Sequence, residues 1–233
     1  MALLNVGTTI VAWLALTFTV CLHLRGSQVD QFNPLVLSLI FFNGLNILIA
    51  LCEIALGRHI DLIKSDYEGL RKKYRGTEWD ACVAFLTMPL TPAQVFDMRS
   101  WSKMWSTYAL YDPSYQNSEA FGFFIDVGNG WSTIPTSLLA LVALVRPDGT
   151  ALEGYASPLV VGCVGIASYW QIMYGTFIYF LSFIWNRRYQ GFRPAEIWTF
   201  VVVSNGIWII FPFVGIYSCV QMLAEGTMTG VYG

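Results

Sequence analysis

Residues 35–57 read LVLSLIFFNGLNILIALCEIALG, an apolar run in which Asn43, Asn46 and Glu53 are the most polar residues. At about 1.5 Å per residue, a helix of this length crosses a hydrocarbon core of about 30 Å. Lipid offers no hydrogen bonds to the backbone, so a segment at membrane depth must satisfy its own polar groups as a helix. The run therefore predicts a membrane-spanning helix that carries polar side chains.

The rest of the chain repeats this pattern. Apolar runs of similar length lie at 6–24, about 120–145, 158–185 and 195–224. The 233 residues are 55% hydrophobic and only 12% charged, whereas soluble domains have about 25% charged residues. The alternating stretches of a membrane barrel are absent from the sequence. We therefore predict an all-α integral membrane protein, a five-helix bundle forming one domain over residues 1–233.

The longest polar stretch, residues 58–119, is predicted to be a long interfacial loop. Its apolar piece at 81–96 is short for a span and contains Pro89 and Pro92, which favours an interfacial or re-entrant element. Six spans is the alternative if this piece crosses the membrane. The aromatic residues that follow suit the boundary between water and lipid, so we expect them to cap the bundle. They are Trp101, Trp105, Tyr108, Tyr111 and Tyr115.

Charge and cysteine usage exclude several classes of function. The net charge is −2, and the basic cluster at 71–75 is interleaved with acidic residues, so a nucleic-acid partner is not expected. The five cysteines form no CxxC pair and are expected to be small buried hydrophobic residues. His23 and His59 stand at span ends next to arginines, which predicts neither a metal site nor a cofactor.

The distribution of Lys and Arg predicts where the chain resides. With five spans, most of these residues fall on the side of the N-terminus, which would place that end in the cytoplasm. The expected location is the endoplasmic reticulum membrane in a eukaryote or the cytoplasmic membrane in a bacterium. Contact with membrane lipids follows directly.

Four of the spans carry polar residues at helical spacing, so that each presents one polar stripe. Polar groups at membrane depth are costly and normally face a bundle interior or a cavity. We therefore expect the stripes to converge on an intramembrane pocket. The alternative is that they form hydrogen bonds from helix to helix. The stripes are Asn43, Asn46 and Glu53; Asp126, Asn129 and Thr133; Gln171 and Tyr174; and Asn205, Trp208 and Pro212.

An ordered set of short motifs runs through the chain. WSTYALYDPSY begins at Trp105, Asp126 follows with a proline nine residues later, and the fourth and fifth spans contain QIMYG from Gln171 and NGIW from Asn205. In order and spacing this set resembles the EXPERA family, which includes emopamil-binding protein, a sterol isomerase, and the sigma-2 receptor. The resemblance covers roughly residues 35–220.

The resemblance implies a five-helix bundle around an apolar cavity. Isomerase members use a second-helix His and Glu together with a third-helix acid to move protons, and Glu53 and Asp126 match the two acids. Asn205 and Trp208 match pocket residues of the family. This chain departs from the isomerase pattern at Ile49, where those enzymes have His, at Thr176, where they have an acid, and at Ser114, where the loop has Arg.

Two functions follow as hypotheses. The first is binding of an apolar lipid, sterol or isoprenoid in the pocket, either as a carrier or as an accessory subunit of a larger membrane complex; a homodimer is a further alternative. The second is a double-bond isomerase with Glu53 as proton donor, Asp126 as acceptor and Trp208 facing a cationic intermediate. The predicted ligand-binding residues are Asn46, Tyr108, Asn129, Gln171, Tyr174, Asn205 and Trp208.

Overall fold

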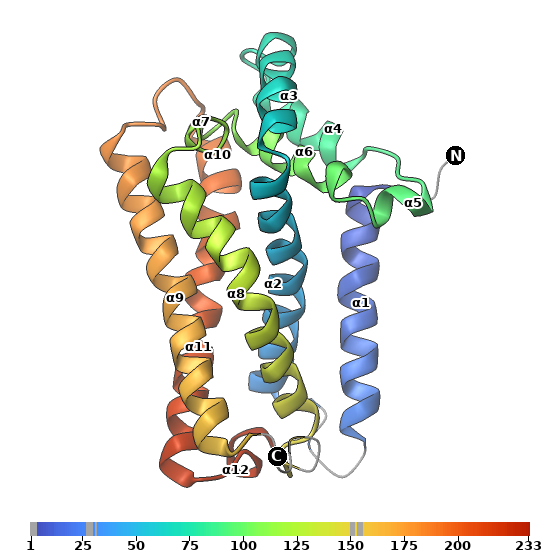
Figure 1. Ribbon diagram of the computed structural model, residues 1–233, viewed down its shortest axis with the longest axis vertical. Helices are drawn as coiled ribbons and strands as arrows, with labels where there is room; N and C mark the ends of the chain where they lie inside the picture. Colours follow the sequence, from blue (N-terminus) through green and yellow to red (C-terminus); the bar gives the residue numbers. More distant parts are fainter. Residues whose placement is uncertain (1–3, 27–29, 31, 150–151, 153–155) are drawn as a thin grey trace. The chain divides into compact units, whose positions relative to one another are not determined.

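The computed structural model describes residues 4–26, 30, 32–149, 152 and 156–233 (Figure 1). Within these ranges the ordered elements are helices, joined by turns and by an isolated antiparallel bridge between Asn5 and Pro89. The predicted all-α class is confirmed.

Five helices in the described part of the chain are long and apolar enough to cross a membrane. This confirms five spans and fits an integral, multi-pass membrane protein. The predicted boundaries agree to within one residue, because long apolar runs fix where a helix can lie in lipid. The helices are α1 (Val6–Arg25), α2 (Pro34–Arg58), α8 (Ala120–Val145), α9 (Pro158–Trp185) and α11 (Ser204–Glu225), the last preceded by α10 (Pro194–Ile197) and a π-helical segment (Trp198–Val203).

The polar stretch 58–119 is not a loop but a series of short helices. Within it, the apolar piece 81–96 is divided between two helices, and a Thr91 capping box with Pro92 at the first helical position starts the second of them. Neither helix is long enough to span lipid. The series is α3 (Ile60–Lys73), α4 (Glu78–Leu86), α5 (Pro92–Val95), α6 (Met98–Tyr108) and α7 (Ser114–Asn117).

By its internal contacts the chain forms two compact units, to which the long helices contribute different segments. Unit 1 comprises Met1–Val11, Ile49–Trp131 and Gly175–Gly206. Unit 2 comprises Ala12–Leu48, Ser132–Tyr174 and Ile207–Gly233.

Unit 1 has an aromatic core. Helices α3 and α4 pack on α6, and the side chains of Trp105, Tyr111 and Tyr115 are buried together with Phe183 of α9. The burial of these three side chains differs from their expected position at the boundary between water and lipid. The Trp105 and Tyr115 rings are tilted against each other, and the Tyr111 ring stacks on Phe200, which removes more apolar area from solvent than a surface position would.

Unit 2 has a mainly aliphatic core around Val36, Leu39, Leu144 and Met222. The α12 helix (Thr229–Tyr232) closes this core with the Tyr232 ring. Arg25 is also buried in this unit, where its guanidinium donates to the Leu144 and Tyr232 carbonyls.

Candidate functional site

Glu53 of α2 and Asp126 of α8 form a carboxyl pair in unit 1. The two groups interact electrostatically, and the Glu53 side chain is buried. Gly130, one turn along α8 from Asp126, explains the close approach of the helices. A Cβ atom on Gly130 would lie 2.9 Å from the Glu53 Cβ and 2.9 Å from the Ala50 carbonyl oxygen, closer than real Cβ contacts allow. Glycine therefore lets the α8 backbone reach α2 beside the acid.

Tyr115 of α7 provides a hydrogen bond to this pair. Its hydroxyl donates to the Asp126 carboxylate, and its ring packs at 4.9 Å from Trp105 and 5.4 Å from Tyr108, measured between ring centroids. Burial raises the pKa of Tyr115 well above its ordinary value, and the charge on Asp126 adds to this effect. Tyr115 is therefore a neutral donor throughout the physiological pH range.

A second group of polar side chains joins three helices of unit 1. The hydroxyls of Tyr108 and Tyr179 lie 2.6 Å apart, and the Asn205 amide donates to the Tyr108 hydroxyl at 2.9 Å. Burial raises the pKa of Tyr108, and the hydrogen bonds from Tyr179 and Asn205 offset only part of that rise. The Tyr108 phenol is thus held protonated, and the three side chains bridge α6, α9 and α11.

The direction of Asn205 depends on the π-helical segment that precedes it. The wider turn of Trp198–Val203 shifts the phase of the helix, and the Asn205 amide also donates to the Val201 carbonyl at 2.8 Å. Interruptions of this kind are frequent at functional sites because they redirect a side chain without ending the helix.

The α6 helix is fixed beside the carboxyl pair by Trp105. Its indole nitrogen donates to the Cys52 carbonyl at 2.6 Å, and Cys52 is the residue before Glu53 in α2. The α6 helix is therefore held next to Glu53, the predicted proton donor. A buried indole with its N–H satisfied is also a rigid anchor.

An ion-pair network joins the residues on either side of α7 to Arg188, which follows α9. Arg188 lies 3.0 Å from the fully buried Asp112 carboxylate and also binds Glu119. Asp112 in turn accepts a hydrogen bond from the Ser114 amide at 3.0 Å, at the start of α7, as expected for a residue facing a helix end. Burial raises the pKa of Asp112, while Ser114 and Arg188 lower it.

The predicted site residues fall into both units. Unit 1 contains Glu53, Asp126, Tyr108, Asn205 and Asn129, the last of which is buried and faces α9, with its amide nitrogen 3.8 Å from a Cβ atom placed on Gly175. Within this unit, Glu53 and Asp126 interact electrostatically, and a hydrogen bond joins Tyr108 with Asn205. A cavity common to all of the predicted residues stays a prediction.

The four predicted residues in unit 2 make separate contacts there. Asn46 donates to the Ser137 hydroxyl at 3.0 Å, and Gln171 donates to the Ser132 hydroxyl at 2.7 Å. Trp208 packs edge-on against Phe42. Tyr174 is 48% exposed and stacks on Trp170, which argues against the pocket role predicted for it.

Sequence reasoning missed three residues that the structure connects to this site. Tyr115 was visible only as part of a motif, and Tyr179 only as one of many aromatic residues in an apolar run, where a tyrosine is more often core than ligand. Arg188 follows the fourth span in an Arg-Arg pair, and its partner Asp112 lies far away in the sequence. The spacing of the aromatic residues from Trp105 to Tyr115 was the one available signal.

Comparisons with protein-family models, with curated proteins and with solved structures return no match for this chain. The class of protein therefore rests on the fold and the site, which define a five-span membrane protein with buried carboxyl and phenol groups in unit 1. Among the described residues, no group of three or more His, Cys, Asp or Glu side chains is arranged to hold a metal ion.

Proposed function

We propose that the protein binds an apolar ligand with one polar group, such as a sterol-like or other isoprenoid lipid, at the Glu53–Asp126 pair. The observation that carries the proposal is the meeting of two carboxyl groups in unit 1, with Tyr115 bonded to one of them. A ligand hydroxyl would donate to the free carboxylate oxygen, and a ligand amine would compensate the charge of the pair.

The cost of these groups supports a ligand. Glu53 and Asp126 lie five and six residues from the ends of their helices, so each costs less than the about 2.5–3.5 kcal/mol of an ionisable residue at a span centre. The repulsion between the two acids adds to this cost and favours a compensating partner. Tyr115, which is bonded to Asp126, and Trp105, which is bonded to the residue before Glu53, belong to the aromatic core of unit 1 and would provide an apolar wall of a lipid site. The resemblance to the EXPERA family favours the same ligand class.

A second candidate is an isomerase that shifts a double bond in such a ligand. The pairing of the acids favours it: Glu53 would protonate one alkene carbon, which leaves a cation on the other, and Asp126 would remove a proton from the next carbon beyond the cation. The double bond then moves by one position with no net change in composition, and return of the proton from Asp126 to Glu53 restores the pair. Ile49 stands where sterol isomerases have His, which favours binding over this reaction. The role of Trp208 toward a cationic intermediate stays a prediction.

Replacing Asp126 by Asn separates the two candidates. An enzyme would lose turnover but keep ligand binding within about tenfold, because the amide preserves shape but cannot accept the proton. A binding protein would lose about 1.5–3 kcal/mol of affinity for a hydroxyl or amine ligand. The measurement is deuterium incorporation from heavy water into a panel of sterols and isoprenoids, beside binding of the same compounds.

Ser137→Ala in α8 is the matched control, because its hydroxyl pairs with Asn46 in unit 2. Equal deuterium incorporation by wild type and Asp126→Asn would remove Asp126 from any mechanism. Mass spectrometry of lipids retained by the purified protein tests the pocket itself. One enriched isoprenoid would support it, and bulk phospholipid alone would favour an accessory subunit.

A further inference from the structure

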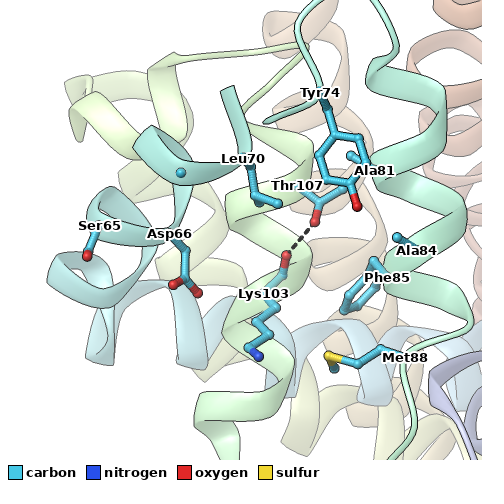
Figure 2. A pocket seen from close by; sticks show the side chains of 11 residues that line it. Ser65, Asp66, Leu70, Tyr74, Ala81, Ala84, Phe85, Met88, Lys103 and Thr107 are labelled. Carbon is cyan, nitrogen blue, oxygen red and sulfur yellow. Dashed lines mark hydrogen bonds between the residues drawn. The ribbon is translucent and has the colours of Figure 1, made fainter. Parts of the chain in front are cut away.

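A groove separate from the carboxyl pair opens between α3, α4 and α6 of unit 1 (Figure 2). Its volume is about 370 Å³, within the range of sites that bind small molecules. The helices that form its walls pack on one another, with α6 in contact with both α3 and α4. The groove is therefore a feature of the short helices between the second and third spans.

The groove combines an apolar wall with two opposite charges. Leu70, Phe85 and Met88 supply the apolar surface, and Asp66 and Lys103 the charges. Figure 2 shows the Lys103 chain extending between Asp66 on one side and Met88 on the other. Among the residues that the structure describes, neither Asp66 nor Lys103 forms an ion pair. The groove thus offers an unpaired anion and an unpaired cation beside apolar side chains.

Backbone hydrogen bonds to the start of the first span fix the level at which the Met88 end of the groove lies relative to the membrane. The Val6 amide donates to the Met88 carbonyl at 3.2 Å, and the Leu90 amide donates to the Leu4 carbonyl at 3.1 Å. Val6 is the first residue of α1, a helix long enough to span the membrane. The Met88 end therefore lies at the boundary of the hydrocarbon core, where lipid headgroups are found.

The outer surface of α4 is also suited to lipid. Trp79, Val83 and Leu86 follow i, i+4, i+7 spacing and are 37%, 45% and 43% exposed, and Phe96 after α5 is 88% exposed. Such an apolar stripe on a short surface helix is typical of a segment that lies in the membrane interface. This stripe suits one wall of the groove for contact with lipid.

We infer that the groove holds the headgroup of a zwitterionic phospholipid of the phosphatidylethanolamine type. The lipid phosphate pairs with Lys103 and its ammonium with Asp66, while the acyl chains leave past Phe85 and Met88 into the bilayer. A purely anionic headgroup would satisfy Lys103 but meet repulsion from Asp66. This inference is independent of the proposed function, because it involves neither Glu53 nor Asp126.

The test is native mass spectrometry of the full chain in detergent, titrated with dioleoyl phosphatidylethanolamine and, separately, dioleoyl phosphatidylglycerol. Lys103→Gln should weaken binding of the ethanolamine lipid about tenfold, the loss of one charge-assisted hydrogen bond. Asp66→Asn should abolish the preference for that lipid over the glycerol lipid. Lys64→Gln and Glu68→Gln are matched controls, because both residues are exposed on α3 and lie outside the groove lining.

Ala84→Trp provides a steric test, because Ala84 lines the groove yet is exposed, so the larger ring blocks the space without disturbing the core. Unchanged circular dichroism and thermal unfolding confirm that each variant folds. Loss of the ethanolamine lipid in Ala84→Trp and Lys103→Gln, with both controls unaffected, supports the inference. Occupancy within twofold of wild type in all three groove variants overturns it, as does tighter binding of the glycerol lipid by wild type.

Discussion

The two units use the same kinds of polar residue in different ways. In unit 2, Asn43 donates to the Tyr169 hydroxyl at 2.9 Å and Asn46 to the Ser137 hydroxyl at 3.0 Å, so each amide links two helices. In unit 1, Asn205 instead joins a tyrosine pair, and a carboxyl pair lies in the same unit. In unit 2 the amides therefore link helix to helix, whereas in unit 1 the amide belongs to a network of buried phenols in the same unit as two interacting acids.

Unit 2 also packs its helices through small residues. A Cβ atom on Gly215 would lie 2.5 Å from the Tyr169 ring, and one on Gly165 would lie 2.5 Å from the Cys219 sulfur. Close approach at small residues is the main source of helix association in lipid, where the hydrophobic effect between helices is absent. Unit 2 is therefore specialised for packing, whereas unit 1 combines packing with polar networks.

The largest expected effect is in the ion-pair network of unit 1. Arg188→Met should lower the free energy of unfolding by about 3–5 kcal/mol, because it leaves the Asp112 carboxylate buried without its partner. The loss should shrink as the pH is lowered. Removing Arg188 raises the pKa of Asp112 further, so the folded variant binds more protons than the unfolded chain and is less stable at high pH.

Unfolding followed by circular dichroism in a mixed-detergent titration, at several pH values, measures this effect. Arg187→Met is the control, since Arg187 is exposed and adjacent in the chain. A loss equal to that of the control, or one that does not depend on pH, would mean that the network contributes nothing to the stability of unit 1.

The second largest loss of stability is expected where glycines of unit 2 contact neighbouring helices. Gly215→Ala should cost about 1–3 kcal/mol, because the new methyl group overlaps the Tyr169 ring. In the same helix, Gly206→Ala meets nothing within 4 Å and should be neutral or slightly stabilising, since alanine favours the helix. Thermal unfolding of both variants gives the comparison, and equal melting temperatures would contradict the close contact.

The smallest effect concerns the amides and sharpens the contrast between the units. Asn46→Ala should lower the free energy of unfolding by about 0.6–1.7 kcal/mol, as measured for interhelical hydrogen bonds in membranes, and leave ligand affinity unchanged. Asn205→Ala should have a similar cost and also weaken ligand binding, because it removes one of the two hydrogen bonds that hold the Tyr108 hydroxyl in place. Ligand affinity measured for the Asn46→Ala and Asn205→Ala variants tests this prediction. An equal change in affinity would contradict the assignment of ligand binding to unit 1 alone.

The sequence by itself determined the class of the protein and the course of its spans. Long apolar runs must become helices in lipid, so the predicted run 158–185 coincides with α9 and 35–57 differs from α2 by one residue at each end. The two acids were also recognisable, because ionisable residues in such runs are rare and costly. Both conclusions depend only on the composition of each apolar run, which is read directly from the sequence.

Only the tertiary structure decided which polar groups meet. The helices of 58–119 are short and amphipathic, so their aromatic residues could not be assigned to a surface or to a core from their spacing alone. Nor could any local pattern reveal that Arg188 pairs with Asp112 or that Gly130 brings α8 against Glu53. Such contacts join residues far apart in the chain, and their free energy depends on distances that arise only when the helices pack.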